Sequence, residues 1–71
     1  MNSNLKLKEL GKAFKKIRLK KKLSQARLAA IIDKDQQSIQ RFEAGKINPS
    51  YIYLLEICEG LECRLDEVIK P

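Results

Sequence analysis

Residues 23–50 read LSQARLAAIIDKDQQSIQRFEAGKINPS, and the architecture of the 71-residue chain is most clearly indicated by this segment. It holds two short apolar patterns at helical spacing, preceded by Ser24 and Asp35, which are residue types that cap helices. The charged tract 33–35 separates the two patterns and indicates a tight turn. Two short helices joined by a brief turn predict a helix-turn-helix unit at about residues 24–44.

The flanking sequence predicts three further helices. An apolar stripe recurs at spacings of three and four over residues 5–21, and a second helix pattern starts at Ser50 and runs to about Cys58. A short last helix is expected at roughly 65–69. No segment alternates as a strand between hairpin turns. We therefore expect one all-α domain over residues 1–71, a compact bundle of about five helices.

The charge is high and unevenly placed. The chain carries fifteen Lys and Arg against nine Asp and Glu, a net charge of +6, with a pI near 9.6. Residues 1–46 carry +9 and residues 47–71 carry −3. Such a basic chain attracts nucleic-acid phosphates or anionic membranes. No apolar run approaches the roughly 20 residues of a membrane span, and the first residues lack a secretory signal, so we expect a cytoplasmic protein.

Eight lysines lie between residues 6 and 22, around the apolar stripe of the first predicted helix. The simplest interpretation is a solvated helix face. Binding to anionic lipid is an alternative, but it would take the stripe away from a small core that needs it. Long-range attraction of DNA is the third interpretation, since charge acts over about 10 Å at 0.1 M salt.

Catalytic and metal chemistry has little support in the composition. The chain has no histidine, which removes the commonest general base and the commonest metal ligand. Cys58 and Cys63 stand alone, without the further ligands that zinc requires, and we expect both to be small, partly buried hydrophobes. We expect no enzyme, no metal site and no cofactor.

The third predicted helix, Gln36 to Ala44, has two distinct faces. At about 100° per residue, Ile39 and Phe42 share one face and seat the helix on its neighbours. Polar side chains occupy the other face. Glutamine matches the adenine edge in the major groove, and arginine matches guanine or a phosphate. The alternative is that the glutamines only solvate an exposed helix, which is the simpler interpretation for a single glutamine but not for a cluster on one face. The predicted base-reading residues are Gln36, Gln37, Gln40 and Arg41.

Three motifs resemble the Cro/CI-type helix-turn-helix family, which includes lambdoid phage repressors and controllers of restriction–modification systems. They are Leu23-Ser24-Gln25-Ala26-Arg27-Leu28-Ala29, Gln36-Gln37-Ser38-Ile39-Gln40-Arg41-Phe42-Glu43-Ala44-Gly45-Lys46, and Asn48-Pro49-Ser50. The resemblance covers about Leu10 to Ile69. It departs at the turn, where Asp33 replaces the usual glycine and Lys34 a small apolar residue.

The resemblance implies a fold, DNA binding and residue roles. Gln25 matches a glutamine that holds a DNA phosphate and in some members braces the first recognition-helix glutamine, here Gln36. Gln37 and Arg41 match base-reading positions. The predicted phosphate contacts are Gln25, Arg27, Lys34, Ser38, Lys46 and Asn48. The resemblance also places Arg18 against Glu43 as a partly buried structural ion pair.

We expect a homodimer, because the acidic carboxyl-terminal part could meet its copy while the two +9 portions stay apart. Candidate interface residues are Ile52, Tyr53, Leu55, Leu61 and Cys63, and the alternative is ordinary core. Such a dimer would set two recognition helices about 34 Å apart on a pseudo-palindrome. The predicted function is therefore sequence-specific regulation of transcription by occupying a double-stranded DNA operator, as a repressor or an activator according to where the operator lies relative to a promoter. The alternative is an antitoxin-like module that binds a protein partner and DNA only secondarily.

Overall fold

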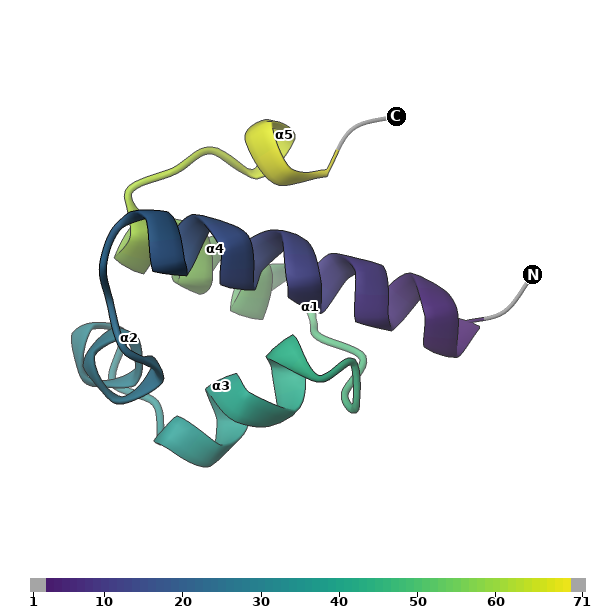
Figure 1. Ribbon diagram of the computed structural model, residues 1–71, viewed down its shortest axis with the longest axis horizontal. Coiled ribbons are helices and arrows are strands. Elements are labelled where there is room, and N and C mark those ends of the chain that lie inside the picture. The colour runs from purple at the N-terminus through teal and green to yellow at the C-terminus, as the bar shows by residue number, and fades with distance from the viewer. Residues whose placement is uncertain (1–2, 70–71) are drawn as a thin grey trace.

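The computed structural model describes residues 3–69, in which five helices and no strand occur (Figure 1). The helices are α1 (Ser3–Lys20), α2 (Gln25–Ile31), α3 (Gln36–Glu43), α4 (Tyr51–Leu61) and α5 (Leu65–Val68). The all-α prediction is confirmed. Within the described range, none of the helices is both long and apolar enough to span a bilayer.

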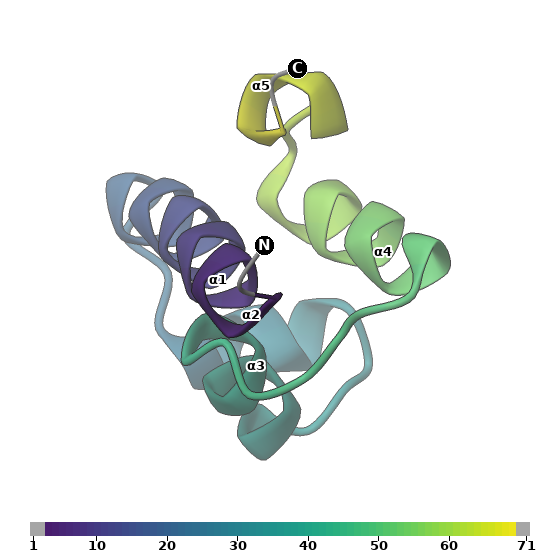
Figure 2. The same ribbon diagram turned by 90° about the vertical axis from the view of Figure 1, so that its right-hand side faces the viewer.

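The helices surround one small core. Figure 1 shows α1 in front of α4, with α2 and α3 below them and α5 above, and Figure 2 shows the same layers along the axis of α1. Phe14 of α1 meets Phe42 of α3 edge to face, with ring centroids 5.3 Å apart. Leu28, Ile39 and Ile57 are also fully buried beside them. The core thus draws a side chain from each of the first four helices.

Side-chain caps set the starts of α2, α3 and α4. Ser24, Asp35 and Ser50 each accept a hydrogen bond from the backbone N–H three residues on, at 3.0, 2.7 and 3.0 Å. Each bond satisfies a donor that the helix itself leaves free. Between α2 and α3, Asp33 adopts the left-handed conformation at φ 57°, where the resembled family has glycine. The predicted helix-turn-helix is present with the expected caps.

The fourth helix is longer than the sequence predicted. We expected it to end near Cys58, but α4 continues to Leu61 and passes through Gly60. A Cβ on Gly60 would lie 2.4 Å from Cγ2 of Ile32. This glycine therefore permits α4 to approach α2 closely, and it does not end the helix. Glu62, at φ 54°, takes the left-handed position that ends α4.

Candidate nucleic-acid interface

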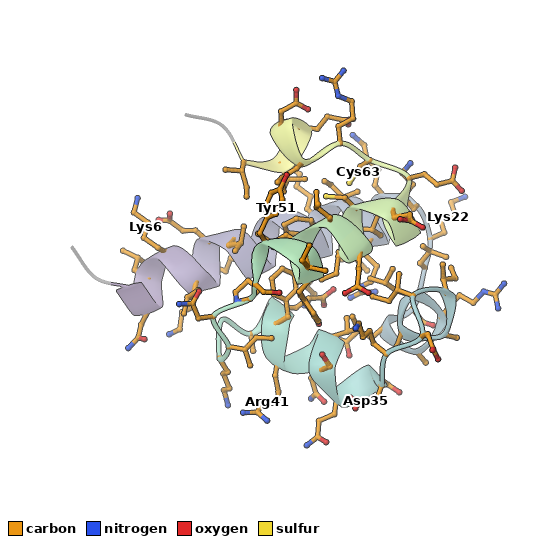
Figure 3. The ribbon with its side chains drawn as sticks, turned by 180° about the vertical axis from the view of Figure 1, so that it is seen from behind. Lys6, Lys22, Asp35, Arg41, Tyr51 and Cys63 are labelled. Atoms are coloured by element: carbon orange, nitrogen blue, oxygen red, sulfur yellow. The ribbon has the colours of Figure 1, made fainter. Side chains whose placement is uncertain are left out.

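The outer face of α3 carries all four predicted base-reading residues. Gln36, Gln37, Gln40 and Arg41 are exposed, whereas Ile39 and Phe42 are almost completely buried on the opposite face. Figure 3 shows the Arg41 side chain at the outer edge of α3, directed away from the other helices. Because the buried face fixes the helix, three amide groups and one guanidinium are presented together to solvent.

The predicted phosphate contacts fall into two groups. Arg27 at the start of α2 and Lys46 and Asn48 in the loop after α3 are exposed. Lys34 is half-buried, and its Nζ lies 3.3 Å from Oε1 of Glu56 on α4. Lys34 would have to leave this partly exposed ion pair to reach a phosphate, at a cost of about 0 to 1 kcal/mol.

Gln25 has a partner that the sequence did not indicate. Its Nε2 donates a hydrogen bond to Oε1 of Glu43, at 2.9 Å. The amide thus ties the first turn of α2 to the end of α3. An amide nitrogen has two hydrogens, so the second N–H remains as a donor for a phosphate.

Ser38, a predicted phosphate contact, has a partner on α4. Its hydroxyl lies 2.8 Å from the hydroxyl of Tyr53 on α4, and both residues are half-buried. Its backbone N–H already donates to the Asp35 cap. The Ser38 hydroxyl therefore joins α3 to α4, and the phosphate contact by Ser38 stays a prediction.

Arg18 and Glu43 form a buried, two-pronged ion pair. Nε and Nη2 of Arg18 donate to the two carboxylate oxygens of Glu43 at 2.6 and 3.0 Å. Nη1 of Arg18 donates to the carbonyl oxygen of Leu23 at 2.6 Å, at the end of the link to α2. The residues are only 5% and 8% exposed. Among the described residues, every buried side-chain nitrogen and oxygen atom has a hydrogen-bond partner, so this pair joins α1, α2 and α3 without a stranded charge.

The predicted interface candidates do not form one patch. Ile52 and Leu55 are exposed on α4, at 63% and 37%, but Leu61 is 1% exposed and belongs to the core. Tyr53 packs its ring on Phe42, with centroids 5.5 Å apart. Cys63 likewise packs against the core. Tyr53 and Leu61 lie on the side of α4 that packs against the core, and Cys63 packs there from the link that follows α4.

Tyr51 completes the exposed apolar surface of α4, although it was not among the predicted interface residues. It is 65% exposed and precedes Ile52 in the first turn. Its spacing of four from Leu55 could have identified it as a member of the same helix face. We call Tyr51, Ile52 and Leu55 the α4 patch.

The cysteines are free thiols in an apolar setting. Cys58 is buried in the core. Burial, followed by the neighbouring Cys63, raises the pKa of the Cys58 thiol from 9.0 to about 12. A thiol that keeps its proton is a weak nucleophile, so Cys58 is suited to packing.

Comparison with known proteins places the chain in a family. A model described as helix-turn-helix matches residues 14–68. Multiprotein-bridging factor 1a of Arabidopsis thaliana is 40% identical over 57 residues, which are 80% of this chain and 40% of that protein. The chain therefore spans less than half the length of this relative.

Among solved structures, the restriction–modification controller protein C.AhdI from Aeromonas hydrophila superposes with a TM-score of 0.88. The match has 26% identity and covers 92% of this chain and 98% of the controller. The capped turn, the exposed α3 face and these matches agree, and the chain belongs to the helix-turn-helix family.

Proposed function

We propose that the protein regulates transcription by binding a pseudo-palindromic operator as a homodimer. The observation that carries this proposal is the outer face of α3, where three glutamines and Arg41 are exposed above a fully packed inner face. A helix with that composition, held after a capped turn in a +6 chain, suits the major groove. The likeness to a restriction–modification controller supports the same function.

Base reading falls to the α3 face. Gln36 and Gln37 lie at the amino end, which enters the groove first in a helix-turn-helix. Gln36, Gln37 and Gln40 each offer an acceptor and a donor side by side, which matches adenine N6 and N7. Arg41, one turn further along than Gln37, matches guanine O6 and N7 or a phosphate.

Phosphate binding falls to groups around α3. Arg27, Lys46 and Asn48 are exposed for this purpose, and Gln25 keeps one N–H beside its bond to Glu43. Lys34 joins them only if it leaves Glu56. These contacts fix the orientation of the protein on the duplex and supply affinity without choosing a sequence.

The α4 patch is the surface proposed for the two-fold contact. Its three apolar residues are exposed together on one helix, and residues 47–71 carry −3 while residues 1–46 carry +9. Contact through the acidic part keeps the two basic parts apart and leaves both α3 faces free for DNA.

Selection of bound sequences from random duplexes tests the readout. The wild type is compared with Gln36→Ala, Lys46→Ala and Lys20→Ala. Lys20 serves as the matched control because it is an exposed lysine about 180° around α1 from Gly11, the position that touches α3. We expect Gln36→Ala to relax the preference at one adenine by about 1 to 3 kcal/mol. Lys46→Ala should weaken binding to all sequences alike, and Lys20→Ala should change neither.

Sedimentation equilibrium tests the dimer. Ile52→Glu should shift the protein toward monomer, while Ile31→Glu, a change of an exposed isoleucine on α2, should leave the association constant unchanged. A wild-type protein that is monomeric both free and on its operator would exclude the two-fold contact. The α4 patch would then be left to a different chain, as the interaction-module alternative requires.

A further inference from the structure

A basic hollow lies outside the helix-turn-helix, between the amino-terminal part of α1 and the loop after α3. Its volume is about 370 Å³, and its walls include Leu7 and Lys8 of α1 and Lys46, Ile47 and Asn48 of the loop. Figures 1 and 2 both place this end of α1 beside the chain that leaves α3. The hollow therefore borders the proposed DNA-reading helix without being part of it.

The backbone holds the two lysines of the hollow at a fixed separation. Gly45 has a φ of 73°, and a Cβ there would lie 2.7 Å from both the backbone nitrogen and the Cα of Lys8. The loop thus passes directly against α1, in a conformation that favours glycine. Ile47 packs against the core beside it. Lys46 follows Gly45 directly, so packing sets its position relative to Lys8.

The charge around the hollow is entirely positive. None of the residues that line it is acidic. Within residues 3–69, neither Lys8 nor Lys46 is within salt-bridge distance of a carboxylate, whereas Lys6, two residues before Lys8, pairs with Glu9. Two unpaired ammonium groups and the Asn48 amide around one concave site attract an anion with several acceptor oxygens.

We propose that this hollow binds one backbone phosphate of the DNA, next to the base pairs read by α3, with Lys8 as a contact from α1. The proposal rests on the proposed function and extends its footprint beyond the helix-turn-helix. Lys8 lies about 60° around α1 from Gly11, whose backbone faces α3, so its side chain lies on the flank of α1 nearest to α3. A duplex seated on α3 brings its sugar–phosphate backbone past this flank.

The test measures the salt dependence of binding for the wild type, Lys8→Gln and the control Lys20→Gln on the duplex recovered by selection. Loss of one phosphate contact lowers the slope of log K against log [salt] by about 0.9, which corresponds to a loss of up to about eightfold in affinity at 0.1 M salt. We expect this change for Lys8→Gln, with the same preferred sequence, and no change of slope for Lys20→Gln. Both lysines are exposed, and equal urea midpoints would verify that both variants are folded.

Ethylation of single phosphates identifies the source of the anion. Ethylation of the phosphate that Lys8 contacts should weaken duplex binding by the wild type. The same ethylation should leave the affinity of Lys8→Gln unchanged, because that variant has already lost the contact. Identical slopes and ethylation patterns for the wild type and Lys8→Gln would overturn the proposal while leaving the proposed function standing. The proposal would also be overturned in favour of a free anion by two results together: inorganic phosphate shifts the nuclear magnetic resonance signals of Lys8 and Lys46 in the wild type, and Lys8→Gln binds the duplex as the wild type does. If the wild type binds no duplex, the proposed function itself fails.

Discussion

Removing the Glu43 carboxylate should destabilise the protein more than any other single loss of an acidic side chain. Glu43 accepts two hydrogen bonds from Arg18 and one from Gln25. In Glu43→Ala the guanidinium of Arg18, which is only 5% exposed, keeps its charge and retains only the carbonyl of Leu23 as a partner. A buried charge that loses its partner costs about 3 to 5 kcal/mol.

That cost is comparable with the whole stability expected of the domain. At roughly 0.05 to 0.15 kcal/mol per residue, a chain of 71 residues is stable by about 4 to 11 kcal/mol. With a urea m-value of about 1 kcal/mol/M, the unfolding midpoint of Glu43→Ala should fall by about 3 to 5 M. The control is Glu56→Ala, which removes the half-exposed partner of Lys34 and should cost about 0 to 1 kcal/mol.

The assay is urea unfolding followed by far-ultraviolet circular dichroism. If Glu43→Ala lacks a folded baseline, all variants are compared in the same concentration of trimethylamine N-oxide, which favours the folded state. The double variant Arg18→Met with Glu43→Leu removes both charges and should recover most of the stability, since apolar replacement of a buried pair is often close to neutral. Equal urea midpoints for Glu43→Ala and Glu56→Ala would refute the assigned role of the pair.

Three further changes test the packing, the turn and the buried thiol. Gly60→Ala should lower the free energy of unfolding, measured in urea melts, by about 1 to 3 kcal/mol, because the new Cβ would meet Ile32 at 2.4 Å. This loss should outweigh the higher helix propensity of alanine. A stabilised variant would contradict the close approach of α4 to α2. Asp33→Gly should raise the free energy of unfolding by up to about 1 kcal/mol, and with it the urea midpoint, because Asp33 holds φ 57° at a steric cost that glycine lacks. An unchanged or lower midpoint would mean that the aspartate itself stabilises the turn. Since burial raises the pKa of Cys58 from 9.0 to about 12, the unfolded chain loses the thiol proton first, so the free energy of unfolding should fall as pH rises above about 9. Cys58→Ala should reduce the decrease in the free energy of unfolding above pH 9 more than Cys63→Ala does. Equal pH dependence in the two variants would contradict the assignment of this decrease to Cys58.

The local sequence was sufficient for most of the fold and for the composition of the α3 face. Ser24, Asp35 and Ser50 cap their helices through bonds to residues only three positions away. Helical spacing placed Ile39 and Phe42 inside and the glutamines outside. These features follow from backbone geometry within one or two turns, which a single stretch of sequence contains.

Tertiary contacts decided the features that depend on neighbours distant in the sequence. The fourth helix was predicted to end near Cys58, but α4 continues through Gly60, where the proximity of Ile32 shows that this glycine serves close packing within a helix. Leu61 has the same local pattern as an exposed leucine, yet it is buried, and Ser38 turns its hydroxyl to Tyr53. Helical periodicity gives the direction of a side chain about its own axis, whereas the identity of what covers that side chain depends on how separate helices meet.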